Sequence, residues 1–234
     1  MTDQAPVLHS CDWILLLVDR SGSMANIVDA TLRGMRRFIH QQQERSHTNL
    51  SVVAFGTNFD GDLQLQTLLD TTIVVRNGDR SIVPSMYQPA GDTPLLAAVW
   101  EVITRLERRK RKQDRVLLAI MTDGIENASG PNYSKTRVRN RIKQKIADGW
   151  QIVYLGAEIE AWKTGDYYGV GPLNALSWSP TQSGVEGIFQ TLADSTNRWT
   201  GRKTLTSGKP PERFFPLQLP SHEDPPPEDP SAGI

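Results

Sequence analysis

Two short apolar runs in this 234-residue chain each end in an aspartate, and this pattern limits the fold more than any other feature. Residues 13–18 read Trp-Ile-Leu-Leu-Leu-Val before Asp19, and residues 116–121 are apolar before Thr122 and Asp123. A continuous apolar run of this length is typical of a strand buried on both faces of a parallel sheet. Both runs therefore predict interior strands that end in polar residues.

Helices and further strands alternate with these two runs. Apolar residues at intervals of three or four predict amphipathic helices, which we expect near residues 27–42, 95–106, 135–147 and 180–192. Further strands are expected at residues 50–55, 151–155 and 175–178, with one or two edge strands between 63 and 75. This alternation predicts an α/β fold with a doubly wound, mostly parallel central sheet and helices on both faces.

Local signals predict where three of the helices begin or end. Thr93 is expected at the N-cap of one helix with Pro94 as its first residue, and Ser179-Pro180 is expected to open the last one. Gly149 is a suitable C-terminal stop for the helix over 135–147.

Oxygen-bearing side chains follow the predicted strands. Asp19, Ser21 and Ser23 stand at alternate positions around a glycine that permits a tight turn. Three oxygens do not complete a Mg²⁺ site, which needs six at short distance. Thr93, before a predicted helix, and Asp123, after the second apolar run, supply two more. The candidate metal ligands are Asp19, Ser21, Ser23, Thr93 and Asp123.

The charge of this set predicts how such a site would behave. Two carboxylates and three neutral hydroxyls neutralise a divalent cation formally but leave it an electrophile, so it still attracts an anion. A carboxylate of a partner protein would fill an open coordination position. Mg²⁺ is the first candidate, with Mn²⁺ or Ca²⁺ as alternatives. The simpler alternative is that Asp19 and Ser21 cap a helix and Asp123 begins a turn.

In these motifs the chain resembles the von Willebrand factor A family, also called integrin I-domain-like. The metal-ion-dependent adhesion site of that family reads D-x-S-x-S, then T, then D, and residues 19–23, Thr93 and Asp123 match it. The resemblance covers roughly residues 8–200. It implies that Ser21, Ser23 and Thr93 coordinate the metal directly, that Asp19 and Asp123 often act through water, and that the metal captures an Asp or Glu of a protein ligand.

The resemblance also suggests a cellular context. Similarity to intracellular bacterial members implies an adaptor or scaffold role, often beside an AAA+ ATPase or within a stress-response complex. The single cysteine, Cys11, excludes an internal disulfide, and the first twelve residues lack the features of a signal peptide. We therefore expect a cytoplasmic protein.

An enzymatic alternative uses the same aspartates in a Mg²⁺-dependent phosphoesterase. Haloacid-dehalogenase-like phosphatases place a second Asp two residues after the first as acid/base, and here that position is Ser21. A hydroxyl does not shuttle protons near neutral pH, so we expect a binding protein rather than an enzyme. Glu126 and Glu158 or Glu160 are interpreted as rim specificity or ordinary surface charge.

Composition excludes two classes of partner. The 26 Lys and Arg balance 26 Asp and Glu, which argues against a dedicated nucleic-acid binder. The basic run between Arg105 and Arg115 is interpreted as a helix C-terminus, where cations are favoured, with an acidic or RNA partner as the alternative. Apolar runs are too short to span a bilayer, so no membrane partner is expected.

The C-terminal residues differ in composition from the rest. We assign residues 1–200 to the domain and 201–234 to an extended or disordered tail, rich in proline and acidic towards its end. Eight of the fifteen prolines lie between Pro210 and Pro230. The segment that begins Phe214-Phe215 is too apolar for a solvated tail. Docking on the domain and binding a partner are both open for it.

Overall fold

A computed structural model describes residues 10–43, 45, 47–72, 86–157, 161–201 and 213–216. Its strands form a six-stranded sheet in the order β3-β2-β1-β4-β5-β6. The strands are β1 (Asp12–Asp19), β2 (Thr48–Thr57), β3 (Leu63–Asp70), β4 (Arg115–Thr122), β5 (Gln151–Gly156) and β6 (Ala175–Ser177). β2 and β3 pair antiparallel, and the other four neighbouring pairs are parallel.

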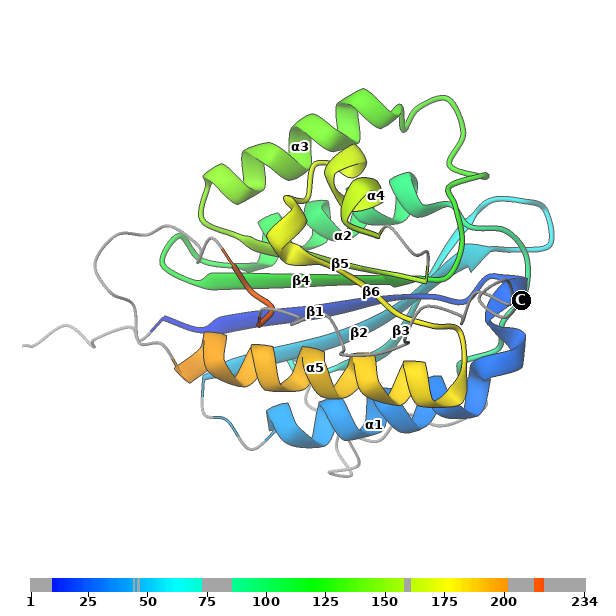
Figure 1. Cartoon of the computed structure of the whole chain (residues 1–234). Helices are drawn as coiled ribbons and strands as arrows, with labels where there is room; N and C mark the ends of the chain where they lie inside the picture. Colours follow the sequence, from blue (N-terminus) through cyan, green and yellow to red (C-terminus); the bar gives the residue numbers. More distant parts are fainter. Residues whose placement is uncertain are drawn as a thin grey trace, which may run out of the picture.

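Helices cover both faces of this sheet, as predicted (Figure 1). α1 and α5 lie side by side on one face, and α2, α3 and α4 lie on the other. The helices are α1 (Val28–Gln43), preceded by a 3₁₀ turn (Gly22–Ile27), α2 (Leu95–Arg109), α3 (Lys135–Ala147), α4 (Ala161–Tyr168) and α5 (Gln182–Gly201). The doubly wound, mostly parallel α/β fold predicted from the sequence is confirmed. No helix of the described ranges has the length and apolar character needed to cross a bilayer.

The position of β1 between two layers of helices explains why its sequence is apolar without interruption. Successive side chains of a strand point to opposite faces. Leu16 and Val18 lie in the cluster that includes α1 and α5, whereas Leu15 and Leu17 lie in the cluster with α2 and α3. Both clusters are buried, so neither face of the strand tolerates a polar residue until the strand ends at Asp19.

The start of α2 differs from the prediction. The helix begins at Leu95, Pro94 occupies the N-cap position, and Thr93 lies outside the helix. The first N–H groups of α2 donate to side chains of another loop, not to a capping side chain of the residues just before the helix. The Glu126 carboxylate accepts from Leu96 N–H at 2.7 Å, and the Ser129 hydroxyl accepts from Ala97 N–H at 2.9 Å.

Two further elements correct the sequence prediction. α5 begins at Gln182 rather than at Ser179-Pro180, because the Thr181 hydroxyl accepts from Gly184 N–H at 3.1 Å and caps it. α4 was not predicted. It contains Gly165, where an added Cβ would lie 2.7 Å from the Ala175 Cβ, so the glycine permits close packing of α4 on β6.

Other predicted boundaries are met. α3 ends at Ala147, and Gly149 follows with a φ of 92°, the left-handed backbone that favours glycine. The edge region contains one strand, β3, and its predicted continuation over residues 73–75 lies outside the described residues.

Part of the C-terminal segment packs on the domain. Phe214 and Phe215 are 5% and 4% exposed and lie in the core cluster that includes α1 and α5. The backbone N–H of Phe214 donates to Asn174 Oδ1 at 3.0 Å. Of the two roles left open for this segment, docking on the domain is the one seen for these two side chains. Residues 202–212 and 217–234 lie outside the described residues.

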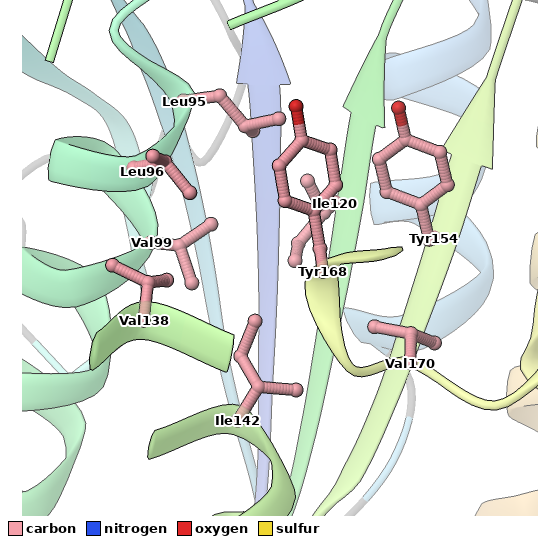
Figure 2. Close-up of a pocket in the computed structure, with 9 residues that line it drawn as sticks. All are labelled: Leu95, Leu96, Val99, Ile120, Val138, Ile142, Tyr154, Tyr168 and Val170. Atoms are coloured by element: carbon pink, nitrogen blue, oxygen red, sulfur yellow. The ribbon is translucent and has the colours of Figure 1, made fainter. Parts of the chain in front are cut away.

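An apolar void separates α2 and α3 from β4 and β5 (Figure 2). Its volume is about 10 Å³, which is room for about one water. Its walls include Val99, Ile120 and Ile142 and the rings of Tyr154 and Tyr168. This is a packing gap rather than a ligand site.

Candidate metal centre

The predicted site residues lie on three loops at the carboxyl edge of the sheet. β1 and β4 are adjacent and parallel, so they end at the same edge of the sheet (Figure 1). Asp19 is the last residue of β1, and Asp123 directly follows β4. Backbone hydrogen bonds join the loops. Gly22 N–H donates to the Gly91 carbonyl at 3.0 Å, and Asn127 N–H donates to the Thr93 carbonyl at 3.2 Å. Neighbouring strands thus bring together residues about a hundred positions apart.

Four of the five predicted residues form a chain of short contacts. Asp19 Oδ1 accepts the backbone N–H of Ser21 at 2.7 Å. The hydroxyl oxygens of Ser21 and Ser23 are 3.1 Å apart, and Ser23 Oγ donates to Asp123 Oδ1 at 2.8 Å. The two carboxylates are therefore linked through the two serines.

Distances from Gly124 show that the fifth residue, Thr93, lies in the same cluster. A Cβ added at Gly124 would lie 2.9 Å from Thr93 Oγ1 and 3.7 Å from Asp19 Oδ2. The space that the absent side chain leaves is bordered by a hydroxyl of one loop and a carboxylate of another. The structure therefore brings all five predicted residues to one place.

The two carboxylates of the cluster are poorly solvated. Burial raises the pKa of Asp19 from 3.8 to about 6, although hydrogen bonds from Thr122 and Ser21 oppose the shift. Burial also raises the pKa of Asp123, against the Ser23 hydroxyl. Asp19 is fully buried, and the nearby Asp123 charge adds to its shift. The protein thus holds two negative groups together at a cost that a bound cation would remove.

Two supporting residues were missed from the sequence. Thr122 Oγ1 donates to Asp19 Oδ2 at 2.6 Å, and Tyr87 Oη donates to the Asp19 carbonyl at 2.6 Å. Thr122 directly precedes Asp123, so its place at the end of a predicted strand was a usable signal. Tyr87 had no such signal in the sequence, because it reaches the site from an irregular segment.

Glu126 is not available as a free rim carboxylate. In addition to Leu96 N–H, it accepts the backbone N–H groups of Ala128 at 2.9 Å and Ser129 at 2.7 Å. Its interpretation as rim specificity or surface charge is therefore wrong, because backbone donors of α2 and of its own loop occupy both oxygens. Glu158 and Glu160 lie outside the described residues.

The donor set fits a hard divalent cation. Within the described ranges, no three His, Cys, Asp or Glu side chains gather as a potential metal site. The candidate site combines two carboxylates with three hydroxyls instead, an all-oxygen set of the kind that Mg²⁺, Mn²⁺ or Ca²⁺ prefers. The Gly124 gap beside Thr93 Oγ1 and Asp19 Oδ2 supports the same assignment.

The basic run near residue 110 contacts its own domain. Arg109 pairs with Asp70 at 2.7 Å, Arg111 with Asp114 at 3.2 Å, and Arg115 with Asp12 at 2.7 Å. The run spans the end of α2, as predicted, but these three arginines are more than a solvated helix end. Arg109 and Arg115 bind carboxylates of other segments, and Arg111 binds Asp114 within the run.

Fold and site together define an α/β domain with an oxygen-rich cluster at the ends of its central strands. Residues 14–126 match the family model described as the von Willebrand factor type A domain, and all five candidate ligands lie within the match. A comparison with curated protein sequences gave no match.

Solved structures show the same fold at low sequence identity. The PilB minor pilin from Streptococcus sanguinis has a TM-score of 0.59 and 13% identity over 86% of this chain, which spans 65% of the pilin. The vWF domain of the pili tip protein Mfa5 from Porphyromonas gingivalis has a TM-score of 0.58 and 9% identity, with 86% of this chain and 99% of that one covered. Manganese-loaded Plasmodium vivax TRAP protein has a TM-score of 0.50 and 24% identity, with 77% and 73% covered.

Proposed function

We propose that Asp19, Ser21, Ser23, Thr93 and Asp123 hold a divalent cation that captures an acidic residue of a partner protein. The observation that carries this proposal is the convergence of two carboxylates, whose pKa values burial raises, and three hydroxyls at the carboxyl edge of the sheet. Mg²⁺ is the first candidate, with Mn²⁺ or Ca²⁺ as alternatives. When bound, the cation would supply a Lewis-acidic centre for an anionic ligand.

The charge count supports binding of a carboxylate. Asp19 and Asp123 supply two negative charges, and the three hydroxyls supply none, so a third carboxylate is not repelled by an excess of protein charge. The serine and threonine hydroxyls orient oxygen ligands without adding charge. A partner Asp or Glu is the group that this balance favours.

The alternative function is a Mg²⁺-dependent phosphoesterase. The raised pKa of Asp19, about 6, is the observation in its favour, because an acid/base group works best near the operating pH. Against it, position 21 is a serine and the nearby Glu126 carboxylate is bound to backbone N–H groups. Hydrolysis of generic phosphate esters with Mg²⁺, lost in Asp19→Ala, would support this alternative and contradict a purely binding role.

The cellular setting is a further part of the proposal. On the resemblance to intracellular bacterial members, we propose a cytoplasmic adaptor whose partner is an AAA+ ATPase or a stress-response complex. Cell fractionation followed by cross-linking to the purified complex would test this. Recovery of the protein at the cell surface would contradict it.

Metal-dependent capture has a direct test. Titration calorimetry with Mg²⁺ and Mn²⁺ should show binding to the unaltered protein, strongly weakened binding to Thr93→Ala, and near-normal binding to Thr93→Ser, which keeps the hydroxyl. Partner recovery should then require the metal and fail in EDTA. A partner that binds equally in EDTA and to Thr93→Ala would overturn the proposal.

A further inference from the structure

A cleft adjoins the candidate metal centre on the side of β2 and β3. Its volume is about 460 Å³, within the range of about 300–1,000 Å³ common for ligand pockets. Arg20 in its wall stands between Asp19 and Ser21, and Asp92 directly precedes Thr93. The remaining lining residues are Thr57, Asn58, Phe59, Gly61, Gln64, Ala90 and Gly91. Two loops of the metal centre thus also contribute residues to the wall of this cleft.

Large apolar side chains are exposed beside the same centre. Among the described residues, the exposed large apolar side chains are Phe59 at 106%, Ile125 at 81%, Tyr167 at 50% and Leu173 at 43%. The two most exposed ones, Phe59 and Ile125, follow β2 and β4, which run parallel to β1 and therefore end at the carboxyl edge of the sheet. Phe59 is in the turn after β2, and Ile125 is two residues after Asp123.

Hydrogen bonds order the two loops that carry these side chains. Asn58 Oδ1 accepts the backbone N–H groups of Asp60 at 3.0 Å and Asp62 at 2.8 Å, which fixes the turn that carries Phe59. Ile125 stands between Gly124, whose N–H donates to Thr122 Oγ1 at 3.1 Å, and Glu126, which is bound to α2. These are apolar contacts presented by ordered loops, which is the arrangement of a binding surface.

Charges around Phe59 decide what the cleft accepts. Asp92 lines the cleft, Asp60 and Asp62 belong to the turn that carries Phe59, and all three are exposed. Arg20, the cation of the cleft wall, is 6% exposed and its guanidinium already donates to the carbonyls of Thr57 at 3.2 Å and Gln88 at 3.3 Å. A second acidic group would meet the Asp92 carboxylate in the cleft wall and a guanidinium that already donates to two carbonyls and to Gln64 Oε1. An apolar side chain meets neither penalty and covers the Phe59 ring.

We infer that the partner segment carries one acidic residue flanked by apolar side chains, one of which enters the cleft against Phe59 while another contacts Ile125. This inference rests on the proposed function, because the metal positions the acidic residue. It adds that Phe59 and Ile125 select the partner.

Defined peptides test the inference without knowledge of the natural partner. The probes are capped Gly-Leu-Asp-Leu-Gly, Gly-Ser-Asp-Ser-Gly, Gly-Glu-Asp-Glu-Gly and Gly-Leu-Asn-Leu-Gly, titrated into the full chain with Mg²⁺ and followed by NMR. We expect the Leu-flanked Asp peptide to bind on the order of tenfold tighter than the Ser-flanked one, since its side chains bury apolar surface. The Glu-flanked peptide should bind more weakly than both, and the Asn peptide should not bind.

Matched variants assign the preference to this surface. Phe59→Ser and Ile125→Ser should each reduce the advantage of the Leu-flanked peptide, Phe59→Leu should retain most of it, and Leu173→Ser should leave it unchanged. Leu173 is the control because it is an exposed apolar residue that precedes β6, away from the carboxyl edge. Phe59 and Ile125 are exposed, so the variants should unfold at the same temperature as the parent chain.

The outcomes separate this inference from the proposed function. Equal binding of the Leu- and Ser-flanked Asp peptides, both lost in EDTA, would overturn the inference and leave metal-dependent capture intact. Binding of the Asn peptide as tight as that of its Asp counterpart, or binding indifferent to EDTA, would overturn metal-dependent capture. Failure of both Asp peptides to bind would count against both.

Discussion

Asp19 and Asp114 are buried carboxylates near opposite ends of β1, and their pKa values move in opposite directions. The pKa of Asp19 is raised to about 6. Burial acts on Asp114 in the same sense, but hydrogen bonds from Cys11 N–H, Arg111 N–H, the Trp13 indole and the Arg111 guanidinium outweigh it and lower the pKa to about 2. Burial acts in the same sense on both carboxylates, but the final pKa shifts are opposite.

The difference lies in the donors that surround each carboxylate. Asp114 has a full set of protein donors, including a cation, so its charge stabilises the fold. Asp19 accepts the Ser21 N–H and hydroxyl bonds from Thr122 and Ser21 but forms no salt bridge among the described residues, and a second carboxylate, Asp123, stands nearby. Asp114 is satisfied by the protein itself, whereas Asp19, in the candidate metal centre, would be satisfied by a bound cation.

The largest expected effect is that of Asp114→Ala. It leaves the Trp13 indole and the N–H groups of Cys11 and Arg111 without their acceptor at a site where Asp114 is 7% exposed. We expect a loss of about 3 kcal/mol in the free energy of unfolding, measured by urea denaturation. A loss as small as that of an exposed-site substitution would show that these bonds do not anchor this end of the sheet.

Lowering the pH should gradually remove the stabilisation that the ionised Asp114 carboxylate gives the fold. The pKa of Asp114 falls from 3.8 to about 2 on folding, so the unfolded chain binds the proton at higher pH than the folded one. Its stabilisation is therefore complete above about pH 4 and declines by about 2 kcal/mol as the pH falls to about 2. Denaturation of the parent chain and of Asp114→Asn over this range would measure it. Parallel stability curves for the two proteins would contradict the assignment.

Removal of the Thr93 hydroxyl should act on the metal rather than on the fold. Thr93→Ala is expected to weaken metal binding by about tenfold, equal to about 1.4 kcal/mol, and to change metal-free stability by less. Calorimetry and metal-free thermal unfolding separate the two quantities. A large loss of metal-free stability would give Thr93 a structural role instead.

The smallest effect on metal-free stability is expected for Asp19→Asn. A neutral amide avoids the desolvated charge, so metal-free stability should stay the same or rise by about 1 kcal/mol, in contrast to Asp114→Asn. Any rise in melting temperature caused by Mg²⁺ should disappear in this variant. If Asp19→Asn destabilised the metal-free chain as much as Asp114→Ala, the distinction between the two carboxylates would fail.

Most of the fold was predictable because its signals are local. The continuous apolar run of β1 indicates burial on both faces, and Gly149 indicates the left-handed turn after α3. α4 escaped prediction because it is short and contains Gly165, whose value lies in its approach to Ala175. The cap of α2 escaped it for a related reason, since its acceptor, Glu126, comes from a different loop.

The sequence by itself determined which residues could form a metal centre, because side-chain oxygens placed after buried strands are recognisable from residue order alone. Only the tertiary structure decided how each carboxylate is used. Asp19, Asp114 and Glu126 look alike in the sequence, yet one lies in the candidate metal centre, one anchors the opposite end of the sheet and one caps a helix. Their roles depend on desolvation and on donors from distant segments, and packing alone brings those together.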